Sequence, residues 1–310
     1  MVSDNDKVVV IGAGNVGATA AYALMLRGLF TDIVLIDADN ARAEAEAIDI
    51  GDANALARPA RVRGGGYDEV GDAGIVVLTA GAATHGDETR LSVAGRSAAI
   101  VRSCVEQVMA AGFNGVLVVA SNPVDAMAQV ARDVSGLAPG RVIGTGTLLD
   151  SLRFRARIAE RLGVAPAAVD GLVLGEHGDS EVAAYSTVRV GGLPLDHYPQ
   201  PEPLDREGIA RDVVRAGYKI VGGKGYTSFG VATAIVRICE AIRRDERVVL
   251  PVSTQLSGQF GITDVYISLP CLIGADGIQA TLSPDLTETE AEALRASADV
   301  LKRILAELRG

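Results

Sequence analysis

The feature that most constrains the fold is a strand, a glycine-rich turn and a helix near the start of the chain. The apolar run 8–11 passes directly into Gly12-Ala13-Gly14-Asn15-Val16-Gly17, and an alanine-rich stretch follows to about Arg27. A second apolar run at 33–36 ends in Asp37, about 20 residues beyond Gly17. A glycine pattern alone is weak, but this full context is typical of a dinucleotide-binding turn.

This turn predicts where the cofactor would lie. Glycines let the backbone approach a pyrophosphate, and the amide groups at the start of a helix meet its negative charge. The Asp37 carboxylate would accept hydrogen bonds from the adenosine ribose and repel a 2′-phosphate, so NAD is favoured over NADP. The expected cofactor-binding residues of this turn are Gly12, Gly14, Asn15, Val16, Gly17 and Asp37.

Apolar strands continue to alternate with helices after this unit. We expect helices at about 40–55, 92–111 and 124–134, and strands at 74–79, 116–119 and 142–144. This alternation indicates an α/β fold with a doubly wound parallel sheet, a Rossmann domain over residues 1–144. Ligands bind beyond the carboxyl ends of such strands. Thr79, Ala80, Gly81 and Asn122 lie at these ends and are further expected cofactor-binding residues.

The second half of the chain, residues 145–310, predicts an α+β catalytic domain. We expect helices at 151–162, 205–221 and 230–243, a strand at 171–174, a hairpin within 182–195, and strands near 248–254 and 264–269. The last helix begins at a capping box of Thr287 and Glu290. Its apolar stripe predicts a face buried in the core or against another subunit.

The composition limits the classes of partner. The 310 residues carry a net charge of −10, which argues against nonspecific binding to nucleic acid. No apolar run approaches the roughly 18–20 residues that span a bilayer, and the polar start of the chain does not resemble a secretion signal. Cys104, Cys239 and Cys271 are scattered, as expected of reduced thiols in a cytoplasm, and none has the spacing of a zinc site. We therefore expect a cytoplasmic protein that binds a small molecule, no membrane and no metal.

One histidine lies where chemistry is expected. Of the three histidines, only His177 lies in a glycine-bracketed turn, directly after the apolar run 172–174. Asp150 and Arg153 lie on one face at the start of a helix, where the first domain should pass into the second. If Asp150 meets His177, it would fix the imidazole tautomer and stabilise the protonated ring. Arg153 could hold a substrate carboxylate in a bidentate fork.

Taken together, these segments resemble the L-lactate and malate dehydrogenase family in order over essentially the whole chain. The matching segments are 12–17, 79–82, 88–91, 121–125, 149–155 and 175–180. The resemblance implies NAD-linked hydride transfer between a 2-oxo acid and its L-2-hydroxy acid, by a self-associated protein, a tetramer or a dimer.

The resemblance also implies a role for each matching residue. His177 would be the proton donor and acceptor, Asp150 would orient it, and Arg153 would bind the substrate carboxylate. Arg90 would polarise the substrate carbonyl after closure of its loop, and Asn122 would bind near the same oxygen. Thr227 would line the pocket, and a cis peptide is implied before Pro123. Two positive groups are physically reasonable there, because hydride addition develops negative charge on the oxygen.

Substrate choice within the family stays open at this point. Thr84 stands where lactate enzymes typically carry glutamine and malate enzymes arginine, so a second carboxylate has no expected partner. Segments 185–190 and 223–232 are similar to the L-2-hydroxyisocaproate dehydrogenase branch, which takes larger aliphatic 2-oxo acids. The leading expectation is an L-lactate dehydrogenase. The alternatives are the hydroxyisocaproate and malate enzymes and, from another class, a catalytically silent NAD-binding protein.

One departure concerns regulation. Many bacterial members bind fructose 1,6-bisphosphate between subunits through an arginine and a histidine. Arg155 matches the arginine, but Asp170 stands at the histidine position, and its carboxylate would repel a phosphate. We therefore expect no activation by the bisphosphate.

Overall fold

The computed structural model describes residues 6–57, 59–82, 90–200 and 202–309, without the side chains of 90–92 and 309. Strands and helices alternate through the first half, as expected from the apolar runs. The strands are β1 (Lys7–Ile11), β2 (Asp32–Ile36), β3 (Arg61–Gly64), β4 (Ile75–Leu78), β5 (Val116–Val119) and β6 (Val142–Gly144). The helices are α1 (Asn15–Arg27), α2 (Asn40–Asn54), α3 (Arg90–Ala110) and α4 (Val124–Ser135).

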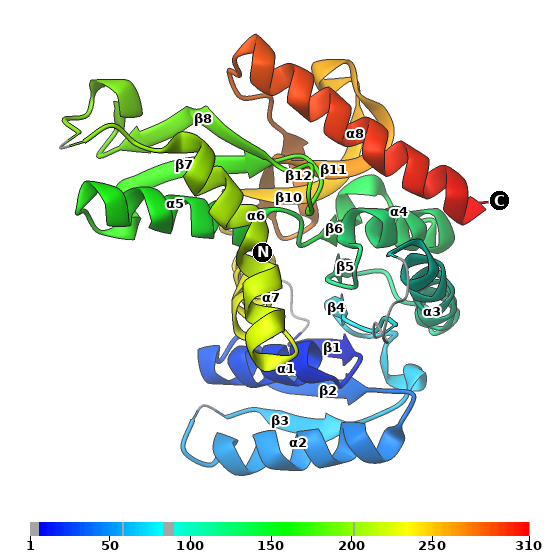
Figure 1. Ribbon diagram of the computed structural model, residues 1–310. Coiled ribbons are helices and arrows are strands. Elements are labelled where there is room, and N and C mark those ends of the chain that lie inside the picture. The colour runs from blue at the N-terminus through cyan, green and yellow to red at the C-terminus, as the bar shows by residue number, and fades with distance from the viewer. Residues whose placement is uncertain (1–5, 58, 83–89, 201, 310) are drawn as a thin grey trace.

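The six strands of the first half form a parallel sheet in the order β6-β5-β4-β1-β2-β3. Alternate residues of β1 enter two different cores, with Val9 on one face of the sheet and Val8 on the other. Helices α3 and α4 cover the first face, and α1 and α2 cover the second (Figure 1). The expected doubly wound parallel sheet is confirmed.

The second half contributes a small sheet and an extension of the large one. Its helices are α5 (Leu148–Leu162), α6 (Arg206–Lys224), α7 (Phe229–Arg243) and α8 (Glu288–Arg309). Its strands are β7 (Val169–Leu174), β8 (Val182–Val190), β9 (Leu193–Pro194), β10 (Val248–Ser257), β11 (Thr263–Gly274) and β12 (Gly277–Thr281). Short 3₁₀ turns lie at Tyr67–Glu69, Pro139–Arg141, Pro166–Ala168, Leu195–His197 and Gln259–Gly261.

Strands β10, β11 and β12 are antiparallel and join the edge of the parallel sheet, which makes one sheet of nine strands. The seam is the pairing of Ser253 on β10 with Gly144 on β6. A side chain at Gly144 would put its Cβ 2.8 Å from the Cβ of Ser253, so glycine permits this close approach. The sequence alone predicted neither this junction nor the strands β3 and β12.

The expected helix boundaries shift by a few residues. Helix α5 begins at Leu148 rather than at Ser151, and α6 continues to Lys224 rather than ending near 221. The capping box of α8 is confirmed, because the Thr287 backbone donates to Glu290 and the Glu290 backbone donates to the Thr287 hydroxyl. The stripe of α8 is buried in the core with α3 and α4 rather than left for a subunit contact; it consists of Leu294, Ala298, Leu301 and Leu305.

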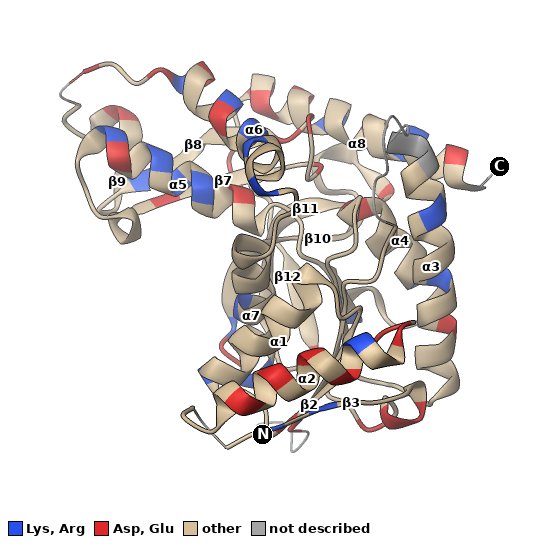
Figure 2. Cartoon of the chain, turned by 60° about the horizontal axis from the view of Figure 1, so that its bottom comes forward, with Lys and Arg blue, Asp and Glu red and all other residues tan. Residues whose placement is uncertain are grey.

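The surface agrees with the acidic composition. Figure 2 shows acidic residues, in red, along α2, whose sequence contains Glu44, Glu46, Asp49 and Asp52. Every helix within the described ranges is too short or too polar to traverse a lipid bilayer.

Candidate active site

The turn between β1 and α1 is shaped by three glycines in different ways. Gly12 has a φ of +101°, in the region that favours glycine, and a Cβ on Gly17 would overlap the carbonyl oxygen of Gly12. The Thr79 hydroxyl, beyond the end of β4, donates to that same oxygen over 2.8 Å. At Gly14 a Cβ would meet no described atom within 4 Å, so this part of the backbone faces open space.

Asp37 closes the turn from the end of β2. Its Oδ2 accepts a hydrogen bond from the Ala13 backbone over 2.7 Å, and its Oδ1 accepts one from Asp39 over 2.9 Å. Gly14 is the N-cap residue of helix α1, so no side chain caps the first amide groups of the helix. An open backbone, uncapped amides and a carboxylate at the neighbouring strand end fit a dinucleotide with a free 2′-hydroxyl, as expected for NAD.

The ends of β4 and β5 are joined next to this turn. The Ser121 hydroxyl, beyond β5, donates to the Ala80 carbonyl beyond β4. Gly81 and Asn122 are exposed at the same edge of the sheet. The peptide between Asn122 and Pro123 is cis, as the resemblance implied.

The turn after β7 brings His177 to Asp150 on α5. Imidazole Nδ1 lies 2.6 Å from Asp150 Oδ2, and Asp150 Oδ1 accepts a hydrogen bond from Arg153 Nη1 over 2.9 Å. The Asp150 side chain is 2% exposed, whereas that of His177 is 31% exposed. A carboxylate on Nδ1 directs Nε2 of the ring away from Asp150, where it can exchange a proton with a bound molecule.

The electrostatics of the pair favour a protonated imidazole at neutral pH. Burial would lower the pKa of His177, but the charge of Asp150 and its hydrogen bond to the ring raise it to about 9. Burial would raise the pKa of Asp150, yet the positive charges of His177 and Arg153 and their hydrogen bonds keep it below its ordinary value. The pair therefore holds a proton on nitrogen and a charge on Asp150.

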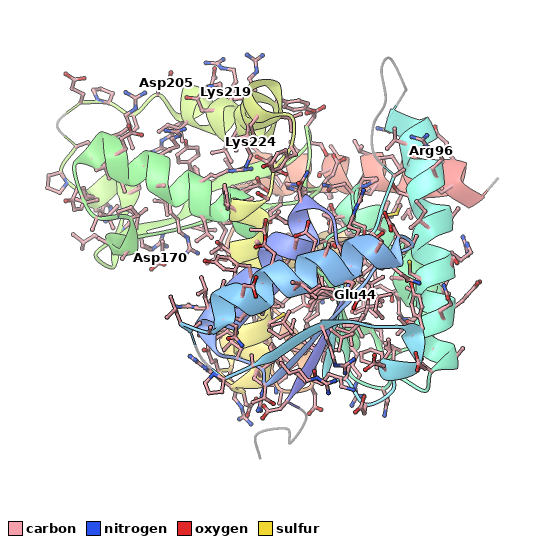
Figure 3. The ribbon with its side chains drawn as sticks, turned by 90° about the horizontal axis from the view of Figure 1, so that it is seen from below. Glu44, Arg96, Asp170, Asp205, Lys219 and Lys224 are labelled. Carbon is pink, nitrogen blue, oxygen red and sulfur yellow. The ribbon has the colours of Figure 1, made fainter. Side chains whose placement is uncertain are left out.

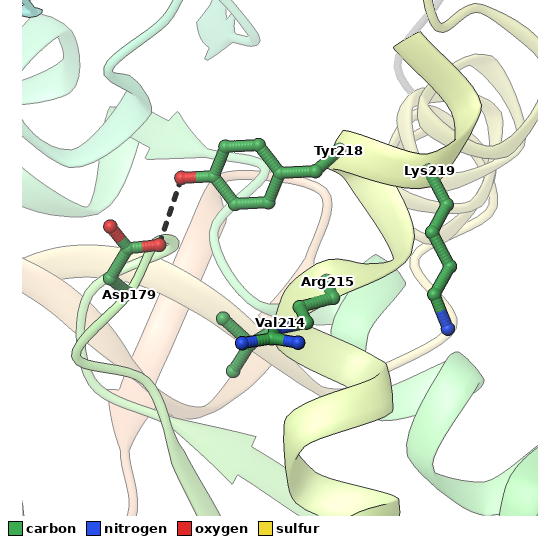
Figure 4. Close-up of a pocket in the computed structure, with 5 residues that line it drawn as sticks. All are labelled: Asp179, Val214, Arg215, Tyr218 and Lys219. Carbon is green, nitrogen blue, oxygen red and sulfur yellow. Dashed lines mark hydrogen bonds between the residues drawn. The ribbon is translucent and has the colours of Figure 1, made fainter. Parts of the chain in front are cut away.

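Hydrogen bonds from other elements hold the turn that carries His177 in place. Gly175 and Ser268 of β11 exchange two backbone hydrogen bonds of 3.1 Å. The Glu176 backbone donates to the hydroxyl of Ser297 on α8 over 2.9 Å. The hydroxyl of Tyr218 on α6 donates to Asp179 Oδ1 over 2.8 Å, next to an open hollow of about 610 Å³ (Figure 4).

Sequence reasoning missed two carboxyl groups at this site. Asp125, the second residue of α4, is buried, and its Oδ2 accepts a hydrogen bond from the His177 backbone over 2.8 Å. Burial raises the pKa of Asp125 to about 6, against hydrogen bonds from Ser253 and His177. Its place two residues after Pro123, in the segment that follows β5, was a usable signal, because such segments carry site residues.

The second missed group is Glu181, just before β8. A ring nitrogen of His177 and one carboxylate oxygen each of Asp150 and Glu181 all lie within 4.8 Å of one another. Such a set could in principle surround a cation, but both Asp150 oxygens are already engaged and the Arg153 guanidinium beside them would repel one. We assign no metal to this cluster, and its geometry suits proton transfer.

Three predicted residues need separate mention. Thr84 and the side chain of Arg90 lie outside the described residues. Thr227 is half-buried in the turn that joins α6 to α7.

The comparisons with known proteins cover both halves of the chain. Residues 6–144 match the family model for the lactate/malate dehydrogenase NAD-binding domain. Residues 147–309 match the model for the alpha/beta C-terminal domain of the same family.

Individual relatives match over nearly the full length. An L-lactate dehydrogenase of Nitratidesulfovibrio vulgaris is 46% identical over 98% of this chain and 100% of its own. The L-lactate dehydrogenase of Limosilactobacillus reuteri is 40% identical over 98% of this chain and 95% of its own. A lactate dehydrogenase from a Medee basin deep-sea metagenome, 39% identical, superposes with a TM-score of 0.95 over 99% of both chains. The minor L-lactate dehydrogenase of Enterococcus mundtii, in its ligands-bound form, is 40% identical and gives 0.93 over 97% of this chain and 98% of that one.

Proposed function

We propose that this chain, which belongs to the lactate/malate dehydrogenase family, is an NAD-dependent L-lactate dehydrogenase. In this function it interconverts pyruvate and L-lactate. The observation that carries the proposal is the chain of contacts from Arg153 through Asp150 to His177. Binding of a dinucleotide alone needs no such arrangement, whereas reduction of a 2-oxo acid needs a proton donor and a partner for the substrate carboxylate.

The proposed mechanism divides the work between three side chains. When NADH is bound, it supplies the hydride for the carbonyl carbon of the substrate. Arg153 fixes the substrate carboxylate; its hydrogen bond to Asp150 uses one of five guanidinium donors. Protonated His177 gives its proton to the carbonyl oxygen as negative charge develops there. Asp150 then stabilises the orientation of the neutral ring, and the hydroxy acid leaves.

The remaining roles are proposed from the family resemblance. Arg90 polarises the carbonyl, Asn122 binds near the same oxygen, and Thr227 and Thr84 line the pocket. The turn 12–17, Asp37, the strand end at 79–81 and Asn122 are the residues that would hold NAD. We place the division between the cofactor domain and the catalytic domain between residues 144 and 145.

We further propose that the enzyme works in the cytoplasm on pyruvate from glycolysis, as a homotetramer or dimer. The thiols support a reducing compartment, because Cys104, Cys239 and Cys271 are all free and buried.

The decisive experiment is NADH oxidation, followed by absorbance, with pyruvate, oxaloacetate and 2-oxo-4-methylpentanoate. We expect pyruvate to give the highest kcat/KM, because Thr84 is uncharged and cannot pair with a second carboxylate. Turnover with none of the three would contradict the dehydrogenase function itself, and a preference for oxaloacetate would contradict only the substrate assignment.

Thr84→Arg tests the substrate assignment directly. The added guanidinium should raise kcat/KM for oxaloacetate relative to pyruvate, since it would pair with the second carboxylate. Thr84→Gln, which adds a long side chain without a charge, is the matched control and should not raise it.

A further inference from the structure

The mechanism leaves Glu181, a half-buried acidic residue, without a task. Glu181 lies in the same turn as His177, and its Oε1 is shielded from solvent with no hydrogen-bond partner among the described residues. One of its carboxylate oxygens lies within 4.8 Å of an Asp150 carboxylate oxygen and of a His177 ring nitrogen. A shielded carboxylate oxygen without a donor is costly, so the geometry favours the neutral acid.

The charges that face Glu181 come from two segments. Helix α5 contributes Asp150 and Arg153, and the turn after β7 contributes His177 and Glu176. Asp125 of α4 reaches the same turn through the His177 backbone. Burial and the charge of Asp150 raise the pKa of Glu181 to about 9, against the opposing charges of His177 and Arg153.

The net charge near the substrate carboxylate depends on whether Glu181 holds a proton. With Glu181 neutral, the charges of Arg153, His177 and Asp150 leave one positive charge to meet a substrate carboxylate. With Glu181 ionised, the charges of all four groups sum to zero, and a second carboxylate competes for Arg153. Because Asp150 is buried and Oε1 of Glu181 is shielded from solvent, such a change is weakly screened.

We propose that Glu181 is a specificity-determining residue that sets the charge met by an anionic substrate, so that a 2-oxo acid binds only while Glu181 holds a proton. This inference rests on the proposed roles of Arg153 and His177. It adds a second required proton to the one that His177 transfers. Glu181 exchanges no proton with the substrate and acts through the charge around Arg153.

The pH profile of kcat/KM for pyruvate tests this proposal. Loss of two required protons lowers kcat/KM about 100-fold per pH unit above about pH 9, whereas loss of one lowers it about 10-fold. We expect the steep profile in the unmodified enzyme and the shallow one in Glu181→Gln, whose amide cannot ionise. Glu181→Asp, which keeps a carboxyl group, should restore the steep profile.

Asp179→Asn is the matched control. It removes one negative charge from the same turn, but at an exposed position, and its Oδ1 can still accept the hydrogen bond of Tyr218. It should keep the steep profile, because its charge is screened by solvent. A profile equally steep in Glu181→Gln, or equally shallow in the unmodified enzyme, would overturn the proposal.

Direct binding separates this proposal from the proposed function. Oxamate, an unreactive analogue of pyruvate, can be titrated into the enzyme with NADH bound, with nicotinamide fluorescence as the readout. Above about pH 9 its Kd should rise by about tenfold more per pH unit in the unmodified enzyme than in Glu181→Gln. If oxamate fails to bind at any pH and pyruvate gives no turnover, the proposed function fails. If both work but Glu181→Gln changes neither pH dependence, only the role of Glu181 fails.

Discussion

The turn at 12–17 and the cluster around His177 meet their ligands with different parts of the chain. The turn offers backbone: Gly14 faces open space, and a Cβ on Gly17 would overlap Gly12. The cluster offers side chains whose charges depend on one another, with Asp150 shared between His177 and Arg153. One site is contiguous in sequence, and the other draws on α4, α5 and the turn before β8.

This difference predicts two kinds of failure. A substitution in the backbone site should damage binding and folding together, because the same atoms serve both. A substitution in the charge cluster should leave the fold intact and change protonation, because several carboxyl groups there compensate one another. Substitutions at the two sites test that division.

His177→Asn should remove the chemistry and leave the fold. Loss of a general acid–base group usually costs about 10²–10⁴-fold in turnover. His197→Asn, at an exposed histidine, is the control and should retain full activity. Turnover of His177→Asn above about a tenth of the unmodified rate would contradict the role.

The direction of the reaction should respond to pH through the same ring. Because Asp150 raises the pKa of His177 to about 9, pyruvate reduction should hold below that pH and fall as the pH rises through it. Lactate oxidation, which needs the neutral ring, should instead strengthen as the pH rises from neutral toward 9. Initial rates in both directions from neutral to alkaline pH provide the check, and parallel rather than opposite trends would contradict it.

Gly17→Ala should damage fold and cofactor binding at once. Its methyl group would overlap the Gly12 carbonyl, so α1 must shift, and we expect a loss on the order of 3 kcal/mol in the free energy of unfolding. Gly14→Ala is the matched control, because its methyl group meets no described atom within 4 Å. It should unfold as the unmodified protein does and bind NADH more weakly. Urea unfolding measures the stability of the two variants, and fluorescence titration measures their NADH binding. Equal stability of the two variants would contradict the prediction.

Asp37→Ser should change cofactor preference rather than stability. Removal of the carboxylate ends the repulsion of a 2′-phosphate and should narrow the preference for NADH over NADPH by about tenfold. The serine hydroxyl can still accept the Ala13 hydrogen bond, which keeps the turn closed. The measurement is the ratio of kcat/KM for the two cofactors. Equal use of both by the unmodified enzyme would contradict the prediction.

The smallest expected effect is that of fructose 1,6-bisphosphate. Arg155 donates through Nε to the Gly171 carbonyl over 2.9 Å, and its Nη1 lies 3.8 Å from Asp170 Oδ1. Asp170 is labelled in Figure 3, and its carboxylate would repel a phosphate that approached Arg155. Pyruvate saturation curves with and without millimolar bisphosphate should coincide, and a leftward shift would show that the site is built differently.

The local signals were enough for most of the sheet and for the expected contact between Asp150 and His177. The apolar runs at 8–11, 33–36 and 116–119 identified buried parallel strands, because both faces of each are covered. Strand β3 escaped notice because its sequence Arg61-Val62-Arg63-Gly64 is charged and pairs on one side with β2. The junction of β10 with β6 depends on a long-range pairing that periodicity does not encode.

The missed carboxyl groups show the same limit at the site. Nothing in the local sequence pattern distinguishes Glu181 from Glu176. In the structure Glu181 lies near Asp150 and His177, whereas Glu176 accepts a hydrogen bond from Ser180. The distinction depends on which side chain the turn directs inward. Asp150 could be predicted because its helix position and the family motif agreed, whereas the burial of Asp125 follows from the packing of α4 against β10 and β11.

The nine-stranded sheet also limits how the molecule can move. Many enzymes that enclose a ligand rotate two domains about a hinge between them. Here hydrogen-bonded strands run across the boundary, with Ser253 beside Gly144. The backbones of His177 and Tyr266 also donate hydrogen bonds across it, to Asp125 and Gln129 of α4. Each bond contributes about 0.5–1.5 kcal/mol, so a domain rotation would break several at once. The turn at 12–17 and the turn that carries His177 are therefore held at a fixed separation by the sheet and by α4.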